Sequence, residues 1–244
     1  MKNKKVIQNL RDGYHLNSKY WQDIKNNRTD LSPKLLNIAI GMLLGDATMY
    51  KVSKNALIKF EQGYQQESFV YHLFDLFKDY TFMLEPGKRI DLHHPIRKGE
   101  VKSYWFKTFS HKTFNDLWDL FYKNANGKKG IPHNLHLSEE CISYWIMCDG
   151  SLAKDKQTMI LHTQSYSFED NIKLSTFLNV QWGFQTQVIQ HKDKYPVIKI
   201  PSSNSKLLKS LISKNVIESI VIQNTCLMIN LLKLVISPPS SFNL

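Results

Sequence analysis

Two aspartates follow apolar segments that resemble each other. Residues 39–47 read AIGMLLGDA and residues 142–150 read ISYWIMCDG, so Asp46 and Asp149 each end an apolar run and precede a small residue. Either aspartate alone could be an ordinary helix end. Two carboxylates that lie close together repel each other and need a hard cation such as Mg²⁺ between them. The pair is therefore a candidate divalent-metal site, provided that the fold brings both residues together.

Each aspartate has a helix in front of it. Ser32 is a good N-cap and Pro33 suits the first helical position, so the pattern predicts a helix over the apolar run that ends at Gly45. A second helix is predicted to start near Ser138, with carboxylates at 139 and 140 that favour the helix dipole. Both helices are apolar nearly all round, which predicts that both are buried.

The segments that follow the two helices also correspond. Strand patterns at 56–62 and 158–164 precede helices that begin at Glu67 and Ser167; strands at 104–109 and 197–200 precede helices at 112–122 and 205–212. Glu61 lies fifteen residues after Asp46, and Gln164 lies fifteen after Asp149. The sequence thus predicts an α+β fold with a pseudo-twofold tandem αββαββα repeat, two central packed helices and two antiparallel sheets.

The repeat also predicts the division of the chain. We expect an N-terminal extension at 1–30, a first half at 31–122, a polar glycine-containing linker at 123–136, and a second half at 137–244 with an atypical tail.

Composition points to a polyanion as the partner. Thirty-two Lys and Arg against twenty-one Asp and Glu give a net charge of +11, and such an excess favours nucleic acid. A lysine-rich composition of the kind that AT-rich genes encode is the alternative explanation. The chain has no apolar run long enough for a membrane span, no secretory segment after its basic start, and three cysteines without a CxxC pair. We therefore expect an intracellular protein without a structural metal.

The two nonamers resemble the element that names the LAGLIDADG homing endonucleases, in the branch that carries two motifs in one monomeric chain. The resemblance covers roughly residues 31–211 and includes KGIP at 129–132 and HTQSYSFE at 162–169. It implies a site-specific double-strand DNA endonuclease of intron homing that hydrolyses phosphodiester bonds with divalent metal held by Asp46 and Asp149. Mg²⁺ is the expected cofactor, Mn²⁺ is expected to substitute, and Ca²⁺ is expected to support binding without cutting.

The resemblance assigns roles to further residues. The backbone carbonyls of Gly45 and Cys148 are expected to bind metal, and Lys129 is expected to be catalytic. Glu61 and Gln164 are expected at equivalent strand positions as metal or water contacts. Basic residues on or beside the strands are expected to bind DNA, and they are Lys51, Lys54, Lys59, Arg89, Arg97, Lys98, Lys107, Lys156, Lys192, Lys194 and Lys199. Because alternate strand residues share a face, Lys59 and Glu61 should point to the same side.

The expected partner is duplex DNA with a long, asymmetric target site, bound by a monomer, and by family analogy the protein works in the mitochondrial matrix. Three alternatives stay open. They are a maturase that binds its own intron RNA, a DNA-binding relative that has lost cleavage, and a basic structural protein with fortuitous motifs. The second is motivated by the tail beyond Ser219, which lacks a family lysine near the second site. Lys214 and Lys233 are the candidate replacements.

Overall fold

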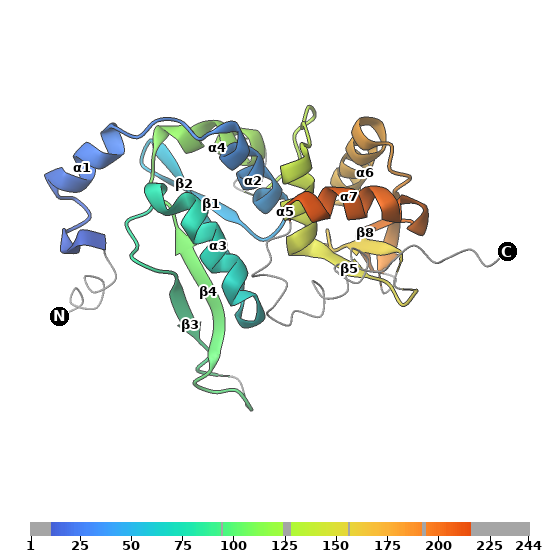
Figure 1. Cartoon of the computed structure of the whole chain (residues 1–244), viewed down its shortest axis with the longest axis horizontal. Coiled ribbons are helices and arrows are strands. Elements are labelled where there is room, and N and C mark those ends of the chain that lie inside the picture. Colours follow the sequence, from blue (N-terminus) through green and yellow to red (C-terminus); the bar gives the residue numbers. More distant parts are fainter. Residues whose placement is uncertain (1–10, 94, 124–127, 156, 192–193, 216–244) are drawn as a thin grey trace. The chain divides into compact units, whose positions relative to one another are not determined.

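The computed structural model describes residues 11–93, 95–123, 128–155, 157–191 and 194–215 (Figure 1). Its contacts form two compact units. The first takes the described residues of 1–36 and 46–123, and the second takes those of 37–45 and 124–244. Within the described part of the chain, no helix combines the length and the apolar character that a membrane crossing requires.

The first unit is built on a four-stranded antiparallel sheet. Its strands are β1 (Thr48–Val52), β2 (Asn55–Gly63), β3 (Gly87–Ile90) and β4 (Val101–Lys107), in the order β1-β2-β4-β3. The helices α1 (Lys19–Asn26), α3 (Glu67–Phe77) and α4 (Asn115–Tyr122) belong to the same unit. The α4 helix follows a 3₁₀ turn at Lys112–Phe114, so the helix predicted over 112–122 is present with a tighter first turn.

The second unit repeats this plan. Its strands are β5 (Gly150–Leu152), β6 (Met159–Leu161), β7 (Gln187–His191) and β8 (Tyr195–Ile200), in the order β5-β6-β8-β7. Its helices are α5 (Glu139–Asp149), α6 (Phe168–Trp182) and α7 (Ser205–Asn215). The helix α2 (Pro33–Leu44) opens the first repeat in sequence, but its residues from 37 onward group with the second unit. The predicted αββαββα repeat is confirmed.

Serine side chains start the helices that matter for the site. The Ser32 hydroxyl accepts from the Leu35 N–H at 3.3 Å, and the Ser138 hydroxyl accepts from the Cys141 N–H at 3.1 Å. These bonds satisfy amide groups that have no partner inside the helix. Both predicted starts are thus confirmed. Residues 141–147 of α5 are all buried, as an all-round apolar helix requires.

Small residues let α2 pack tightly on α5 within the second unit. A Cβ added to Gly41 would lie 2.3 Å from the carbonyl oxygen of Cys141, and one added to Gly45 would lie 2.6 Å from the Cβ of Cys148. Real Cβ atoms do not approach other atoms that closely, so the absence of a Cβ at these two positions sets the separation of the helices. The predicted pairing of two central helices is confirmed along this stretch.

Each sheet has one apolar face. In the first unit Phe60 and Phe106 are fully buried and stack at 4.7 Å, and Phe74 of α3 covers Phe106 edge-on at 5.4 Å. In the second unit Leu161 and Ile198 lie opposite each other on β6 and β8, both fully buried. Period-2 alternation therefore leaves the other face of each sheet for polar residues.

The strand predicted at 158–164 is shorter than expected. β6 ends at Leu161, and Gln164 lies in a turn. The buried Asn171 side chain explains this difference, because its amide donates to the backbone carbonyls of Thr163, Tyr166 and Ser167 at 2.9 to 3.4 Å. The Thr163 carbonyl, which lies inside the predicted strand, would need a strand partner if the ladder continued.

Candidate functional site

Asp149 lies where the end of α2 meets the end of α5. It is the last residue of α5, and the position of a Cβ on Gly45 would be 3.4 Å from its Oδ1 and 2.6 Å from the Cβ of Cys148. The Trp145 indole N–H, one turn earlier, donates to Asp149 Oδ2 at 3.3 Å. Three of the predicted metal-site residues, Gly45, Cys148 and Asp149, are thus brought together in the second unit.

Asp46 is the next residue after Gly45 in the chain, and the contacts group it with the first unit. It lies in the turn between α2 and β1. In the described part of the chain, no group of three His, Cys, Asp or Glu side chains is placed to hold a metal ion.

Lys129 lies at the same helix end. Its ammonium donates to the Gly45 carbonyl at 2.6 Å and lies 5.5 Å from the centre of the Tyr166 ring. The Tyr166 hydroxyl donates to the carbonyls of Leu43 and Leu44 at 3.3 and 3.0 Å. The last carbonyls of α2 are the negative end of its dipole, so a cation and a hydroxyl are the groups that suit them. Sequence reasoning missed Tyr166, because nothing in its neighbours signals this long-range contact.

Glu61 lies on the polar face of the first sheet and contacts side chains from three strands. Its Oε1 accepts from the Ser103 hydroxyl at 2.6 Å and lies 3.2 Å from Arg89 Nε; its Oε2 accepts from Arg89 Nη2 at 3.3 Å and from the Lys59 ammonium. Burial acts to raise the pKa of Glu61, but the hydrogen bonds from Lys59 and Ser103 and the charges of Lys59 and Arg89 lower it overall. Lys59 and Glu61 share a face, as predicted.

The same face is hollow and cationic. A concavity of about 690 Å³ has Leu57 and Trp105 among its apolar walls, and the Lys59 ammonium lies 5.8 Å from the Trp105 ring centre. Five of its lining residues are cations, namely Lys51, Lys59, Lys88, Arg89 and Lys107. Sequence reasoning named four of these and missed Lys88 and Trp105. Alternation along β4 could have found Trp105, since it is two residues from Lys107 and shares its face.

The other predicted DNA contacts are scattered. Lys54 is exposed in the turn between β1 and β2. Arg97 and Lys98 are exposed in the segment between β3 and β4, where Arg97 lies 5.2 Å from the Tyr64 ring. In the second unit Lys199 is half-buried on β8 and Lys194 is exposed beside Tyr195. Lys156 and Lys192 lie outside the described residues.

Gln164 is not at the strand position equivalent to Glu61. The pairing of Gly150 with Leu161 continues to Asp149 and His162, where the His162 N–H donates to the Asp149 carbonyl at 2.8 Å. His162 therefore lies across from the second aspartate. Its ring contacts the Ser151 hydroxyl at 2.6 Å and the Gln164 amide at 3.1 Å. The prediction assumed that equal fifteen-residue spacings lead to equivalent strand positions. This is wrong because the first hairpin is longer than the second, so the same spacing ends at a different position in the strand pairing.

Known proteins share this architecture and these motifs. Residues 36–208 match the LAGLIDADG DNA endonuclease family. The chain belongs to this family. A probable intron-encoded DNA endonuclease 3 of Mycosarcoma maydis is 46% identical over 119 residues, which is 47% of this chain and 87% of that protein. A probable intron-encoded endonuclease 1 of Wickerhamomyces canadensis is 28% identical over 224 residues, 88% of this chain and 94% of that one.

A solved structure of a homing endonuclease has a similar fold. The homing endonuclease I-WcaI bound to its DNA recognition sequence superposes with a TM-score of 0.76 at 27% identity, covering 86% of this chain and 94% of that chain. The resemblance seen in the sequence, the α+β fold and the enzyme class, a DNA endonuclease, are thus confirmed.

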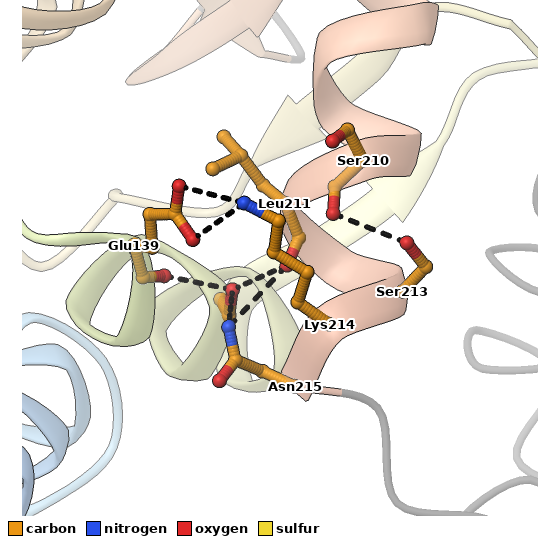
Figure 2. Close-up of polar contacts among 7 residues, drawn as sticks. Glu139, Ser210, Leu211, Ser213, Lys214 and Asn215 are labelled. Atoms are coloured by element: carbon orange, nitrogen blue, oxygen red, sulfur yellow. Dashed lines mark hydrogen bonds and ion pairs between the residues drawn. The ribbon is translucent and has the colours of Figure 1, made fainter.

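Lys214 is poorly placed to replace the family lysine of the second site. Its ammonium lies 3.0 Å from both carboxylate oxygens of Glu139, the first residue of α5 (Figure 2). Asp149 is at the other end of that helix, about 15 Å away at 1.5 Å per residue. The suggestion that Lys214 supports Asp149 is therefore wrong for this LAGLIDADG protein. Lys233 lies outside the described residues.

Proposed function

We propose that this LAGLIDADG protein is an intron-homing endonuclease that makes a staggered double-strand break at a long, asymmetric DNA site. The observation that carries the proposal is the packing of Gly45 against Cys148 and Asp149. Gly45 immediately precedes Asp46 in the chain, so the Gly45 carbonyl and the Asp46 carboxylate of the first motif belong to adjacent residues. A pseudo-twofold pair of acids at two helix ends suits an enzyme that cuts two strands.

The oxygen donors at this place fit a hard divalent cation. Asp46 and Asp149 would hold it with their carboxylates, and Gly45 and Cys148 would add their carbonyls. The Gly45 carbonyl takes one hydrogen bond from Lys129, and a carbonyl oxygen has two lone pairs, so it can still serve as a ligand. When bound, Mg²⁺ or Mn²⁺ would supply an activated water and stabilise charge on the scissile phosphate. Ca²⁺ is proposed to support binding without cutting.

The chain's own residues have separate tasks in this proposal. Trp145 fixes the orientation of the Asp149 carboxylate through its indole N–H. Lys129 brings a positive charge to the end of α2, where it can stabilise phosphate charge or position water. Burial of residues 141–147 keeps the α5 scaffold rigid, which limits how far Asp149 can move.

DNA binding is supported by charge and shape. Five cations line the concavity at the first sheet beside Trp105, and three of them, Lys59, Arg89 and Lys107, share the face of Trp105. A sheet laid in the major groove reads base edges with alternate side chains. Because the corresponding face of the second unit has Lys199 and His162 instead, the two half-sites are proposed to differ in sequence. The protein is proposed to act as a monomer in the mitochondrial matrix, with DNA as its partner.

Selection of cleaved duplexes from a randomised library tests this function directly. We expect one long consensus in Mg²⁺ or Mn²⁺, none in Ca²⁺, and loss of cutting in Asp46→Asn and Asp149→Asn with binding retained. One consensus recovered by selecting bound duplexes, with no cutting in any metal, would indicate a cleavage-defective relative. Tight binding of intron RNA, unchanged in both variants and without DNA cutting, would favour the maturase. Binding without any sequence preference would overturn the proposal in favour of a basic structural protein.

A further inference from the structure

The acceptor sites of Glu61 are filled by the chain's own donors. A carboxylate has two oxygens with about two lone pairs each. Oε1 has the Ser103 hydroxyl and Arg89 Nε as partners, and Oε2 has Arg89 Nη2 and the Lys59 ammonium. A metal ion or a cytosine amino group would have to displace one of these charge-assisted contacts. The arrangement is therefore better suited to holding the cations than to binding metal or a base.

Glu61 joins cations from strands that do not pair with each other. Lys59 is on β2 and Arg89 on β3, and β4 lies between them. Two strand spacings separate their backbones by about 10 Å, yet both side chains reach the same carboxylate. Two cationic groups this close repel each other, so they would move apart without an anion between them.

The surroundings limit the movement of this group. Trp105 lies opposite Glu61 on β4, and Gly87 lies opposite Trp105 on β3. A Cβ on Gly87 would be 2.9 Å from the Trp105 ring, so the ring lies directly over the backbone there. Lys59 is only 18% exposed, whereas the Arg89 side chain is 54% exposed. The Arg89 guanidinium has five N–H donors, and its contacts with Glu61 engage its Nε and Nη2 nitrogens.

We propose that Glu61 is a positioning residue that holds Lys59 and Arg89 as one reading unit for guanine-containing base pairs in the major groove. Guanine offers two adjacent acceptors, O6 and N7, and oriented Arg and Lys donors recognise them. The inference rests on the proposed function, since it requires a DNA-facing sheet. An acid weakens general attraction to DNA, and the presence of Glu61 between Lys59 and Arg89 is explained by the orientation that it gives to these two cations.

The test compares base preferences of wild type and Glu61→Gln in the full-length protein. Both are used to select bound duplexes from a randomised library in Ca²⁺ at fixed salt. We expect Glu61→Gln to lose about tenfold in preference for guanine at one or two positions of one half-site. Its affinity for unrelated DNA should rise, because a negative charge has been removed. Arg89→Met should lose preference at the same positions, and the double variant should lose little more.

Glu169→Gln is the matched control, since it removes the same charge from an exposed α6 acid paired with Lys173. If Glu61→Gln changes affinity for all sequences by the same factor as Glu169→Gln, the inference is overturned. It is also overturned if base preference is kept and cleavage instead needs more metal. Ser103→Ala provides a milder variant should Glu61→Gln not fold, and it should weaken the same preference. Failure of wild type to select any consensus would count against the proposed function, not against the role of Glu61.

Discussion

The Lys129 ammonium lies 2.6 Å from the Gly45 carbonyl oxygen, at the residue directly before Asp46. The Tyr166 hydroxyl donates to the Leu43 and Leu44 carbonyls. Lys129 and Tyr166, both in the second unit, thus provide hydrogen-bond donors for the last carbonyls at the end of α2. The backbone that leads into the first aspartate is thus fixed by a lysine and a tyrosine that are more than eighty residues away in the sequence.

Under the proposed function, Lys129→Met should lower cleavage by on the order of 10²-fold, because it removes the ammonium that is proposed to stabilise phosphate charge and that holds the Gly45 carbonyl next to Asp46. Stability should fall by about 1 kcal/mol, the usual effect of one lost hydrogen bond. Single-turnover cleavage and urea unfolding measure the two effects. Lys129→Arg keeps the charge and should retain more activity. Equal loss of activity and stability in both variants would point to a packing role instead.

Tyr166→Phe should destabilise the protein by about 1–3 kcal/mol, since it leaves two buried helix carbonyls without their hydroxyl partner. The comparison is Tyr20→Phe, which loses a hydrogen bond to Asp12 on an exposed surface and should cost less than about 0.5 kcal/mol. Urea unfolding followed by circular dichroism gives both values. Equal costs would show that the Tyr166 hydroxyl contributes nothing specific.

Gly41→Ala should be destabilising although alanine favours helix. The gain in helix propensity is about 1 kcal/mol, but the new methyl would lie 2.3 Å from the backbone oxygen of Cys141. Backbone cannot move aside as a side chain can, so we expect a net loss of about 1–3 kcal/mol. Gly63→Ala is the control, because no atom lies within 4 Å of its added methyl. Thermal unfolding of both variants measures the two changes in stability. A Gly41→Ala variant that is more stable than wild type would contradict tight packing of α2 on α5.

The repeat could be predicted because its signals are local. Helix starts at Ser32 and Ser138 depend on side chains within three residues, and the strand patterns depend on period-2 burial. The contacts that define the site are not local. Four donors on Glu61 come from three strands, and His162 faces Asp149 only because the second hairpin is shorter than the first. The sequence gives only the number of residues between two positions. Which residues face each other across paired strands depends also on hairpin length and on side chains such as Asn171 that end a strand.

His72 should make stability depend on pH in the weakly acidic range. Burial lowers its pKa from 6.5 to about 4; Asp75 acts to raise it and Lys34 to lower it. The unfolded chain therefore binds a proton near pH 6.5, while the folded chain does so only near pH 4. The free energy of unfolding should be highest above pH 6.5 and fall as the pH drops toward 4.

Urea unfolding at several pH values, compared between wild type and His72→Gln, measures this dependence. The variant should have a flatter profile between about pH 6.5 and 4. His133→Gln, at an exposed position, should keep the wild-type slope. An unchanged slope in His72→Gln would show that other groups cause the acid sensitivity.

His162→Ala should impair cleavage more than Gln164→Ala. His162 lies across from Asp149, with a 2.8 Å backbone bond, and its ring contacts Ser151 at 2.6 Å, whereas Gln164 reaches this place only through the His162 ring. Under the proposed function Asp149 is a metal ligand, and side chains that surround such a ligand typically change activity by about 10–100-fold when removed. We therefore expect a loss in that range for His162→Ala and a smaller one for Gln164→Ala. Strand-specific nicking assays on the selected site should place the His162→Ala defect mainly on one strand, because the first half carries Glu61 rather than histidine on the corresponding strand. A larger loss in Gln164→Ala would restore the assignment made from equal spacing, and an equal loss on both strands would mean that His162 acts through the fold as a whole.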